Sequence, residues 1–248
     1  MAAASTGKEV LKGGMGNDLI RGSHKNGEVQ YLEGNQGDDV LYGGDMAAAQ
    51  HLTGGTGNDD IHGGNTGLGA HLIDGEAGDD RIFGGNANTV GEVKLYGGSG
   101  NDQIFEGNGN TEARKLFGDD TETDEEDGDD VIDAGDGPGD LYIYGAGGND
   151  KIIGGNSGGE MQILNGGSGD DKLWSINPGQ LQDATGAYMY GNSGNDILYG
   201  SNGYEKMYGD DPDTAAGGDD IIFTGENDEA SGFGDDVYGG GGNDRIYG

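Results

Sequence analysis

The stretch from Leu95 to Ile104 reads LYGGSGNDQI: two aliphatic residues nine positions apart enclose a glycine-rich turn that ends in Asn-Asp. Variants of this stretch occur eleven times along the chain, and nine of the eleven keep the spacing of nine residues. The aliphatic residues before the turn form one column: Leu11, Leu32, Leu52, Ile73, Leu95, Leu116, Ile143, Leu164, Met189, Met207 and Val237. Those after the turn form a second column: Ile20, Leu41, Ile61, Ile82, Ile104, Ile132, Ile152, Leu173, Leu198, Ile222 and Ile246. The fixed spacing indicates one short structural unit repeated along the whole chain.

The period of this unit predicts the fold. The central glycine of the turn recurs every 20 to 28 residues, with no break that would mark a linker. Periods of this length are typical of solenoids, in which stacked coils share one thin core. The composition agrees with this interpretation. With 59 glycines among 248 residues and an apolar share of 31%, the chain has too few large apolar side chains to fill a layered core. We predict an all-β fold, a parallel β-solenoid of the β-roll or β-helix kind, with about eleven coils of two short strands in one continuous domain over residues 1–248.

Charge and cysteine content exclude several classes of function. The 47 acidic residues outnumber the 12 basic ones, and the formal net charge of −35 would repel nucleic acid. The chain has no cysteine, its four histidines lack the spacing of metal ligands, and no apolar run is long enough to insert into a membrane. Many of the acidic residues fall at one place in the turn, so a fold that brings them together needs a cation between them. Calcium is the natural candidate.

The two sides of each coil follow different rules. The turn side keeps its length except after Gly118 and Gly209, where acidic insertions follow, whereas the connection to the next coil varies from nine residues to sixteen. Variable connections are typical of surface loops without a repeated role. We therefore expect a repeated site on the turn side and none on the opposite side.

The full turn pattern, G-G-x-G-[ND]-D-x-U-x, is intact at residues 13–21 and 239–247 and resembles the RTX (repeats-in-toxin, hemolysin-type) calcium-binding nonapeptide. The resemblance implies calcium ions between the turns of consecutive coils, held by backbone carbonyls and by the last Asp of each turn: Asp18, Asp39, Asp59, Asp80, Asp102, Asp130, Asp150, Asp171, Asp196, Asp220 and Asp244. Eleven turns leave room for about ten ions, in a single column since only one side of each coil carries the motif. The second glycine of the motif is replaced at Asn35, Glu76, Ala146 and Asn192. The alternative is that Asn and Asp serve only to form turns.

The residue before that Asp alternates strictly between Asn and Asp. We include this second set among the candidate metal residues: Asn17, Asp38, Asn58, Asp79, Asn101, Asp129, Asn149, Asp170, Asn195, Asp219 and Asn243. Duplication of a two-coil unit would produce the alternation. A functional explanation is that alternate coils differ in their cation contacts or in their charge.

Aromatic residues gather beside the two aliphatic columns, as at Tyr96, Phe117 and Tyr144. Because side chains alternate along a strand, we expect these rings to point outward and to stack between coils about 4.8 Å apart. The stacks would stabilise a thin solenoid, or they would offer a binding surface for a protein or glycan.

The two ends of the chain carry no recognisable cap. The first strand expected, around Val10 and Leu11, and the last, around Ile246, would leave open edges. We expect head-to-tail self-association into a filament or surface assembly, unless the chain is a fragment whose caps lie elsewhere. The start of the chain lacks a basic and hydrophobic leader, so a signal would have been removed or export would use another route.

These observations favour a non-catalytic, extracellular or cell-surface calcium-binding module that folds on binding calcium. No nucleophile, base and acid constellation is recognisable in the sequence. The alternatives are a ligand-binding or adhesin segment for a glycan, a surface or ice, and the repeat tail of a secreted RTX enzyme. Ice binding has little support, because the turn lacks a threonine column.

Overall fold

The computed structural model describes residues 7–45, 47–65, 69–86, 91–109, 112–119, 128–156, 161–176, 187–210, 217–225 and 234–248. All regular structure in these ranges is β-strand. Eleven strands lie before the turns: β1 (Lys8–Met15), β3 (Val29–Gln36), β5 (Ala49–Thr56), β7 (His71–Ala77), β9 (Val93–Ser99), β11 (Arg114–Phe117), β13 (Leu141–Gly147), β15 (Gln162–Ser168), β17 (Ala187–Ser193), β19 (Glu205–Tyr208) and β21 (Asp236–Tyr238). Eleven shorter strands follow the turns: β2 (Leu19–Arg21), β4 (Val40–Tyr42), β6 (Asp60–His62), β8 (Arg81–Phe83), β10 (Gln103–Phe105), β12 (Val131–Asp133), β14 (Lys151–Ile153), β16 (Lys172–Trp174), β18 (Ile197–Tyr199), β20 (Ile221–Phe223) and β22 (Arg245–Tyr247).

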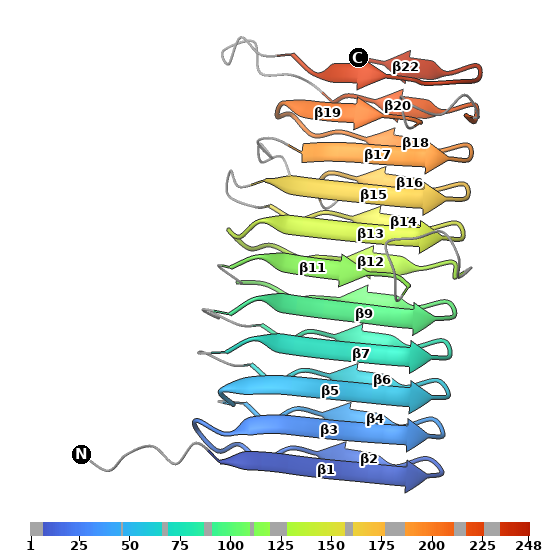
Figure 1. Ribbon diagram of the computed structural model, residues 1–248. Helices are drawn as coiled ribbons and strands as arrows, with labels where there is room; N and C mark the ends of the chain where they lie inside the picture. The colour runs from blue at the N-terminus through green and yellow to red at the C-terminus, as the bar shows by residue number, and fades with distance from the viewer. Residues whose placement is uncertain are drawn as a thin grey trace.

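These strands form two parallel sheets of eleven strands each, one from the odd-numbered strands and one from the even-numbered strands. Each strand pairs with the equivalent strand of the next coil, so the chain climbs along one axis from β1 to β22 (Figure 1). The predicted all-β parallel solenoid with two strands per coil is confirmed. In the part of the chain that the structure describes, no helix is long and apolar enough to cross a membrane.

The two aliphatic columns form the core between the sheets. Leu52 pairs in register with Ile73 and Ile73 with Leu95, and all three are buried. The register survives the acidic insertion, because Leu116 still pairs with Leu95 on one side and Ile143 on the other. A parallel stack keeps the same residue type at the same place in every coil, so even a narrow core is dry. Only the end coils break this rule: Leu11 and Val237 are partly buried, and Ile246 is 50% exposed.

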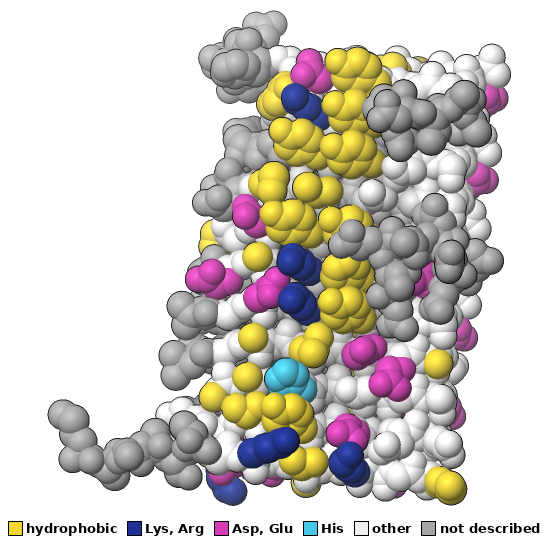
Figure 2. Space-filling view, in the orientation of Figure 1, with side chains coloured by type: hydrophobic (Ala, Val, Ile, Leu, Met, Phe, Trp, Pro, Cys, Tyr) yellow, Lys and Arg dark blue, Asp and Glu magenta, His cyan; other side chains and the backbone are white. Residues whose placement is uncertain are grey.

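Aromatic rings on the outer faces stack along the axis as expected. The centroids of neighbouring rings in these stacks are 4.7 to 5.2 Å apart, as for Tyr96 on Phe117 and Phe117 on Tyr144. Figure 2 shows the resulting apolar stripe along the face of the odd-numbered strands, with basic side chains beside it. On strand β11, the ammonium group of Lys115 lies 5.9 Å from the centre of the Tyr142 ring. Rings that cover one another's faces favour a stabilising role, and binding of a ligand here stays a prediction.

Candidate metal centre

The turn between the two sheets contains two residues with positive φ in each regular coil, the second glycine of the motif and the central glycine. The central glycine has φ of 96° at Gly16 and 135° at Gly78, and the second glycine has φ between 106° and 120° at Gly14, Gly55, Gly98, Gly167 and Gly240. In the four coils that lack this glycine, Asn35, Glu76, Ala146 and Asn192 adopt φ between 71° and 83°. The backbone therefore keeps a left-handed turn in these coils, at a steric cost for residues with a side chain.

The last Asp of each turn joins consecutive coils through its first carboxylate oxygen. The backbone N–H of Asp59 donates to Oδ1 of Asp80 at 2.7 Å, and the same bond recurs in ten successive pairs at 2.7 to 3.1 Å. We call this the inner ladder. Its members from Asp39 to Asp220 are buried, so the ladder lies inside the turn and not on its surface.

The second oxygen of the same carboxylates carries the evidence for a cation. In ten coils Oδ2 is buried without a hydrogen-bond partner: Asp18, Asp39, Asp59, Asp80, Asp102, Asp130, Asp150, Asp171, Asp196 and Asp220. It lies against the first glycine of the motif and beside a carbonyl of the next coil. A Cβ at Gly13, for example, would lie 2.5 Å from Asp18 Oδ2 and 2.8 Å from the carbonyl oxygen of Gly34. Each gap between coils thus gathers oxygen acceptors with no donor for Oδ2, and a proton or a cation has to supply the missing positive charge.

The residues present fit calcium, which takes six to eight oxygens from carboxylates and carbonyls in a flexible geometry. Within the described ranges, no three His, Cys, Asp or Glu side chains come close enough to hold a metal by themselves. A regular gap offers one carboxylate, and backbone carbonyls would have to complete the coordination. This donor set suits calcium better than zinc, which prefers nitrogen and sulfur ligands.

Burial makes the charged form of the inner carboxylates unfavourable when no cation is present. It raises the pKa of Asp59 and Asp220 to about 6 and that of Asp80 to about 7. Further inside the stack, the pKa reaches about 8 for Asp102, Asp150, Asp171 and Asp196 and about 9 for Asp130. Neighbouring carboxylates add to the effect, and the backbone N–H donors of the ladder oppose it.

The alternating Asn and Asp residues lie apart from this row, at the exposed tip of the turn. They form a second ladder, which we call the outer ladder, whose hydrogen bonds run opposite to those of the inner ladder. Here the side-chain oxygen of one coil accepts from the backbone N–H of the following coil. Asp79 N donates to Asn58 Oδ1, and Asn101 N donates to Asp79 Oδ1, both at 3.0 Å. The structure therefore brings the inner Asp residues to the gaps between coils and uses the tip residues to join the coils from outside. Direct contact of the tip residues with a metal stays a prediction.

The outer ladder gives the alternation a physical reason. Asn and Asp both supply the accepting oxygen, but Asn also supplies an N–H₂ donor. Asn149 Nδ2 donates to Asp129 Oδ1 at 2.9 Å, and Asn195 Nδ2 donates to Asp170 Oδ1 at 2.9 Å. In a ladder made only of Asp, the carboxylates of consecutive coils would lie next to each other and would repel. An Asn between two Asp residues removes that repulsion. These contacts favour the explanation by charge, and duplication of a two-coil unit stays the alternative.

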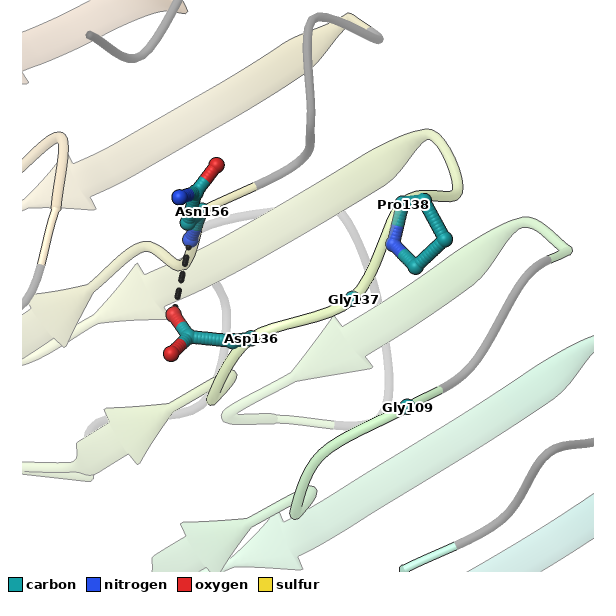
Figure 3. Close-up of a pocket in the computed structure, with 5 residues that line it drawn as sticks. All are labelled: Gly109, Asp136, Gly137, Pro138 and Asn156. Atoms are coloured by element: carbon teal, nitrogen blue, oxygen red, sulfur yellow. Dashed lines mark hydrogen bonds between the residues drawn. The ribbon is translucent and has the colours of Figure 1, made fainter. Parts of the chain in front are cut away.

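The opposite side of the coil carries a repeated hydrogen-bond ladder in the first seven coils, although the expectation that it holds no repeated metal site stays a prediction. A third ladder joins His24, Asp45, Asn65, Asn86, Asn108, Asp136 and Asn156, each accepting from the backbone N–H of the next at 2.7 to 3.0 Å. Figure 3 shows its last step beside a shallow pocket lined by Gly109, Gly137 and Pro138. Each member stands four residues after the second aliphatic column, a spacing that the variable total length of the connection conceals.

Behind this third ladder, interior side chains supply donors where the turn side has none. Gln50 Nε2 donates to the carbonyl of Gly44 at 2.8 Å, and Gln162 Nε2 donates to the carbonyl of Gly155 at 2.6 Å. In one coil the role falls to Arg114, which is buried, donates to the carbonyl of Gly137 at 2.9 Å and pairs with Glu106. Carbonyls satisfied by side-chain donors need no cation. This contrast supports a calcium column on the turn side only.

Glu205 stands in the same interior column as Gln162, and Glu205→Gln is expected to stabilise the protein at alkaline pH. Burial raises the pKa of Glu205 to about 8, and this effect is larger than that of the hydrogen bonds from Ser201, which lower the pKa. Its contribution to stability is thus fully present below its ordinary pKa near 4.5 and is lost as pH rises through about 8. We expect a gain of about 2 kcal/mol near pH 9 and little change near pH 5, measured by urea unfolding in saturating calcium. An equal gain at both pH values would contradict this assignment.

A comparison with known proteins agrees with this geometry. The family model described as RTX calcium-binding nonapeptide repeat matches residues 4–24, 29–45, 51–66, 65–91, 89–111, 142–157, 158–175, 188–211 and 229–248. No curated protein and no solved structure matches the chain. The segment 112–141, which contains the first acidic insertion, lies outside the family matches. The matches cover most of the chain and include nine of the eleven turns, all except those of Asp130 and Asp220, and the chain therefore belongs to the RTX calcium-binding nonapeptide repeat family.

Proposed function

We propose that this chain is a non-catalytic structural module that acts outside the cell, folds when it meets calcium, and joins head to tail with copies of itself. The observation that carries the proposal is the row of ten buried, unpartnered Asp Oδ2 atoms beside backbone carbonyls. Ions in these gaps would supply the positive charge that a chain of net charge −35 lacks. Because binding occurs only in the folded state, calcium would supply folding free energy.

The direction of this switch suits a secreted protein. At the low calcium level inside a cell, repulsion among the acidic residues keeps the chain from compacting, and the low level leaves the gaps unfilled. At the millimolar calcium level outside, the same gaps fill and the coils stack. The protein would therefore reach its folded form after export.

The two ends of the solenoid support self-association. At the C-terminal end Tyr238 and Tyr247 are 54% and 50% exposed. Following the strand register from coil to coil leads from Tyr247 down to Arg21 and from Tyr238 down to Lys12. A second copy stacked in register would thus place each of these cations over a tyrosine ring, a favourable cation–π contact. Arg21 already lies over the Tyr42 ring at 4.9 Å within its own chain.

The backbone ladders favour the same arrangement. The inner ladder runs from each Asp N–H to the Asp of the next coil. Among the described residues, Asp18 Oδ1 therefore receives no such bond and the Asp244 N–H gives none. A head-to-tail neighbour would supply both. The outer ladder begins at Asn17 and ends at Asn243, so the junction brings together two neutral residues.

The test is electron microscopy and sedimentation of the whole chain with millimolar calcium and with excess chelator. We expect elongated assemblies that depend on calcium. Replacing Tyr238 and Tyr247 with Lys would place like charges against Lys12 and Arg21 and should leave monomers that still fold. Met161→Lys adds one positive charge at an exposed position away from both ends and is the control for each single Tyr→Lys substitution. Monomers of the unaltered protein at high calcium would overturn the self-association, and a complete β signal in chelator at neutral pH would overturn the calcium dependence.

A further inference from the structure

The two coils with insertions depart from the repeat in the same way. After Gly118 and after Gly209 the chain continues with Asp-Asp where a regular coil has its second glycine. The two first Asp residues, Asp119 and Asp210, are both buried. The remainder of each insertion, residues 120–127 and 211–216, lies outside the described ranges.

The structure places these two carboxylates in the gap that leads to the next coil. Asp119 Oδ2 accepts from the backbone N–H of Gly147 at 3.2 Å, and Asp210 Oδ2 accepts from the equivalent Gly241 at 2.9 Å. Asp210 Oδ1 also accepts from Gly218 N at 3.2 Å. In both coils, therefore, a side-chain carboxylate accepts a backbone N–H across the gap to the next coil.

The same two gaps contain the regular site. Asp130 Oδ2 and Asp220 Oδ2 are buried and have no hydrogen-bond partner. A Cβ at Gly118 would overlap Asp130 Oδ2 and approach the carbonyl oxygen of Gly145 to 2.6 Å, as in the regular coils. Asp119 is close enough to Asp130, and Asp210 to Asp220, for each to disfavour ionisation of its neighbour.

A hydrogen-bond acceptor alone does not explain these residues, since Asn would accept the same N–H without adding a charge. A second buried carboxylate beside Asp130 is unfavourable unless a cation lies between them. A regular gap has one inner carboxylate for each divalent ion and leaves one positive charge uncompensated. With two carboxylates, the gap neutralises the ion in full.

We propose that the two insertion coils form the strongest calcium sites of the column, in which Asp119 and Asp210 act as second carboxylate ligands. Calcium affinity rises with the number of charged ligands in a site. The insertions would then not interrupt the column, although the family pattern is lost there. Calcium would bind first at these two coils, and the neighbouring coils would then stack onto them. This inference rests on the calcium binding proposed above.

The test is a calcium titration of the full chain against a chromophoric chelator, with the number of sites and their affinities as the result. We expect two sites that bind about tenfold tighter than the rest, and one tight site fewer in each of Asp119→Asn and Asp210→Asn. Asn retains an oxygen for the Gly147 or Gly241 N–H, and circular dichroism at saturating calcium checks the fold. Glu112→Gln removes one charge from an exposed loop position between β10 and β11, outside both sets of candidate metal residues, and should keep both tight sites.

The outcomes separate this inference from the general function. A chain that binds no calcium overturns the proposed function itself. Uniform affinities in the unaltered protein, or two tight sites that persist in Asp119→Asn and in Asp210→Asn, overturn the role of Asp119 and Asp210 while leaving the calcium column intact. An equal loss in Glu112→Gln would assign the effect to net charge and would also overturn it.

Discussion

Removal of calcium near pH 8 is expected to unfold the solenoid, and acidification to about pH 5 is expected to restore it without calcium. The reason is the row of inner carboxylates, whose pKa values burial raises to between about 6 and about 9. Each must carry a proton or face a cation in the folded state. Circular dichroism in excess chelator across this pH range measures the effect.

The sign follows from the raised values. A carboxyl whose pKa is higher in the folded state contributes stability that is fully present below its ordinary pKa, 3.8 for Asp, and is lost as pH rises through the folded value. Stability without calcium should therefore fall between about pH 4 and pH 9. One pKa unit corresponds to about 1.4 kcal/mol. Summed over eight such carboxyls, the loss exceeds the stability of about 5–15 kcal/mol of a typical domain.

Two exposed tip residues oppose this trend. Hydrogen bonds from Asn101 and Asn243 lower the pKa of Asp79 and Asp219, so their contribution is present above the ordinary pKa and is lost at lower pH. Both are solvent-exposed, so solvent screening keeps their effect small.

Saturating calcium at pH 8 should restore the β signal that chelation removes. A metal-free chain equally folded at pH 5 and pH 8 would contradict the role given to the inner ladder.

Gly75→Ala is expected to destabilise the protein by about 3 kcal/mol and to abolish one calcium site. A Cβ at this glycine would overlap both Asp80 Oδ2 and the carbonyl oxygen of Gly97. The carbonyl belongs to the backbone of a paired strand, so it cannot move aside without breaking the register of β7 and β9. Calcium stoichiometry and urea unfolding at fixed calcium measure the two effects.

Gly234→Ala is the matched control for this substitution. A Cβ there meets no atom within 4 Å, and the residue does not adopt a left-handed conformation. We expect unchanged stoichiometry and stability within about 0.5 kcal/mol of the unaltered protein. If Gly75→Ala behaved like this control, the gap beside Asp80 could not be the place where a cation binds.

The fold was predictable because the sequence repeats its core. Leu52, Ile73 and Leu95 occur at one place in consecutive units, and a parallel stack turns that recurrence directly into register. The buried Asp row was predictable for the same reason, since the resemblance to the nonapeptide named its members and their spacing was constant. The aromatic stacks followed from the alternation of side chains along each strand.

The remainder depends on contacts between coils that one repeat does not reveal. Asp45 and Asn65 form a ladder on the side whose loops vary, and its spacing of four residues becomes visible only when counted from the second aliphatic column. Gln50 and Arg114 share one interior column although their side chains differ, because both donate to loop carbonyls. The position of Asp119 could not be predicted, because it is the first residue of an insertion that interrupts the motif, although the inner ladder continues through that coil.

The alternation along the outer ladder also restricts how the gene for this protein can grow or shrink. Deletion of a coil with Asn at its tip would bring two Asp residues into contact, as loss of the coil of Asn149 would do to Asp129 and Asp170. Loss of a coil with Asp would bring together two Asn residues, which tolerate each other. Insertion or removal of two coils at once preserves the order everywhere. Recombination should thus change the length of such a chain in steps of two coils, with single losses confined to the Asp coils.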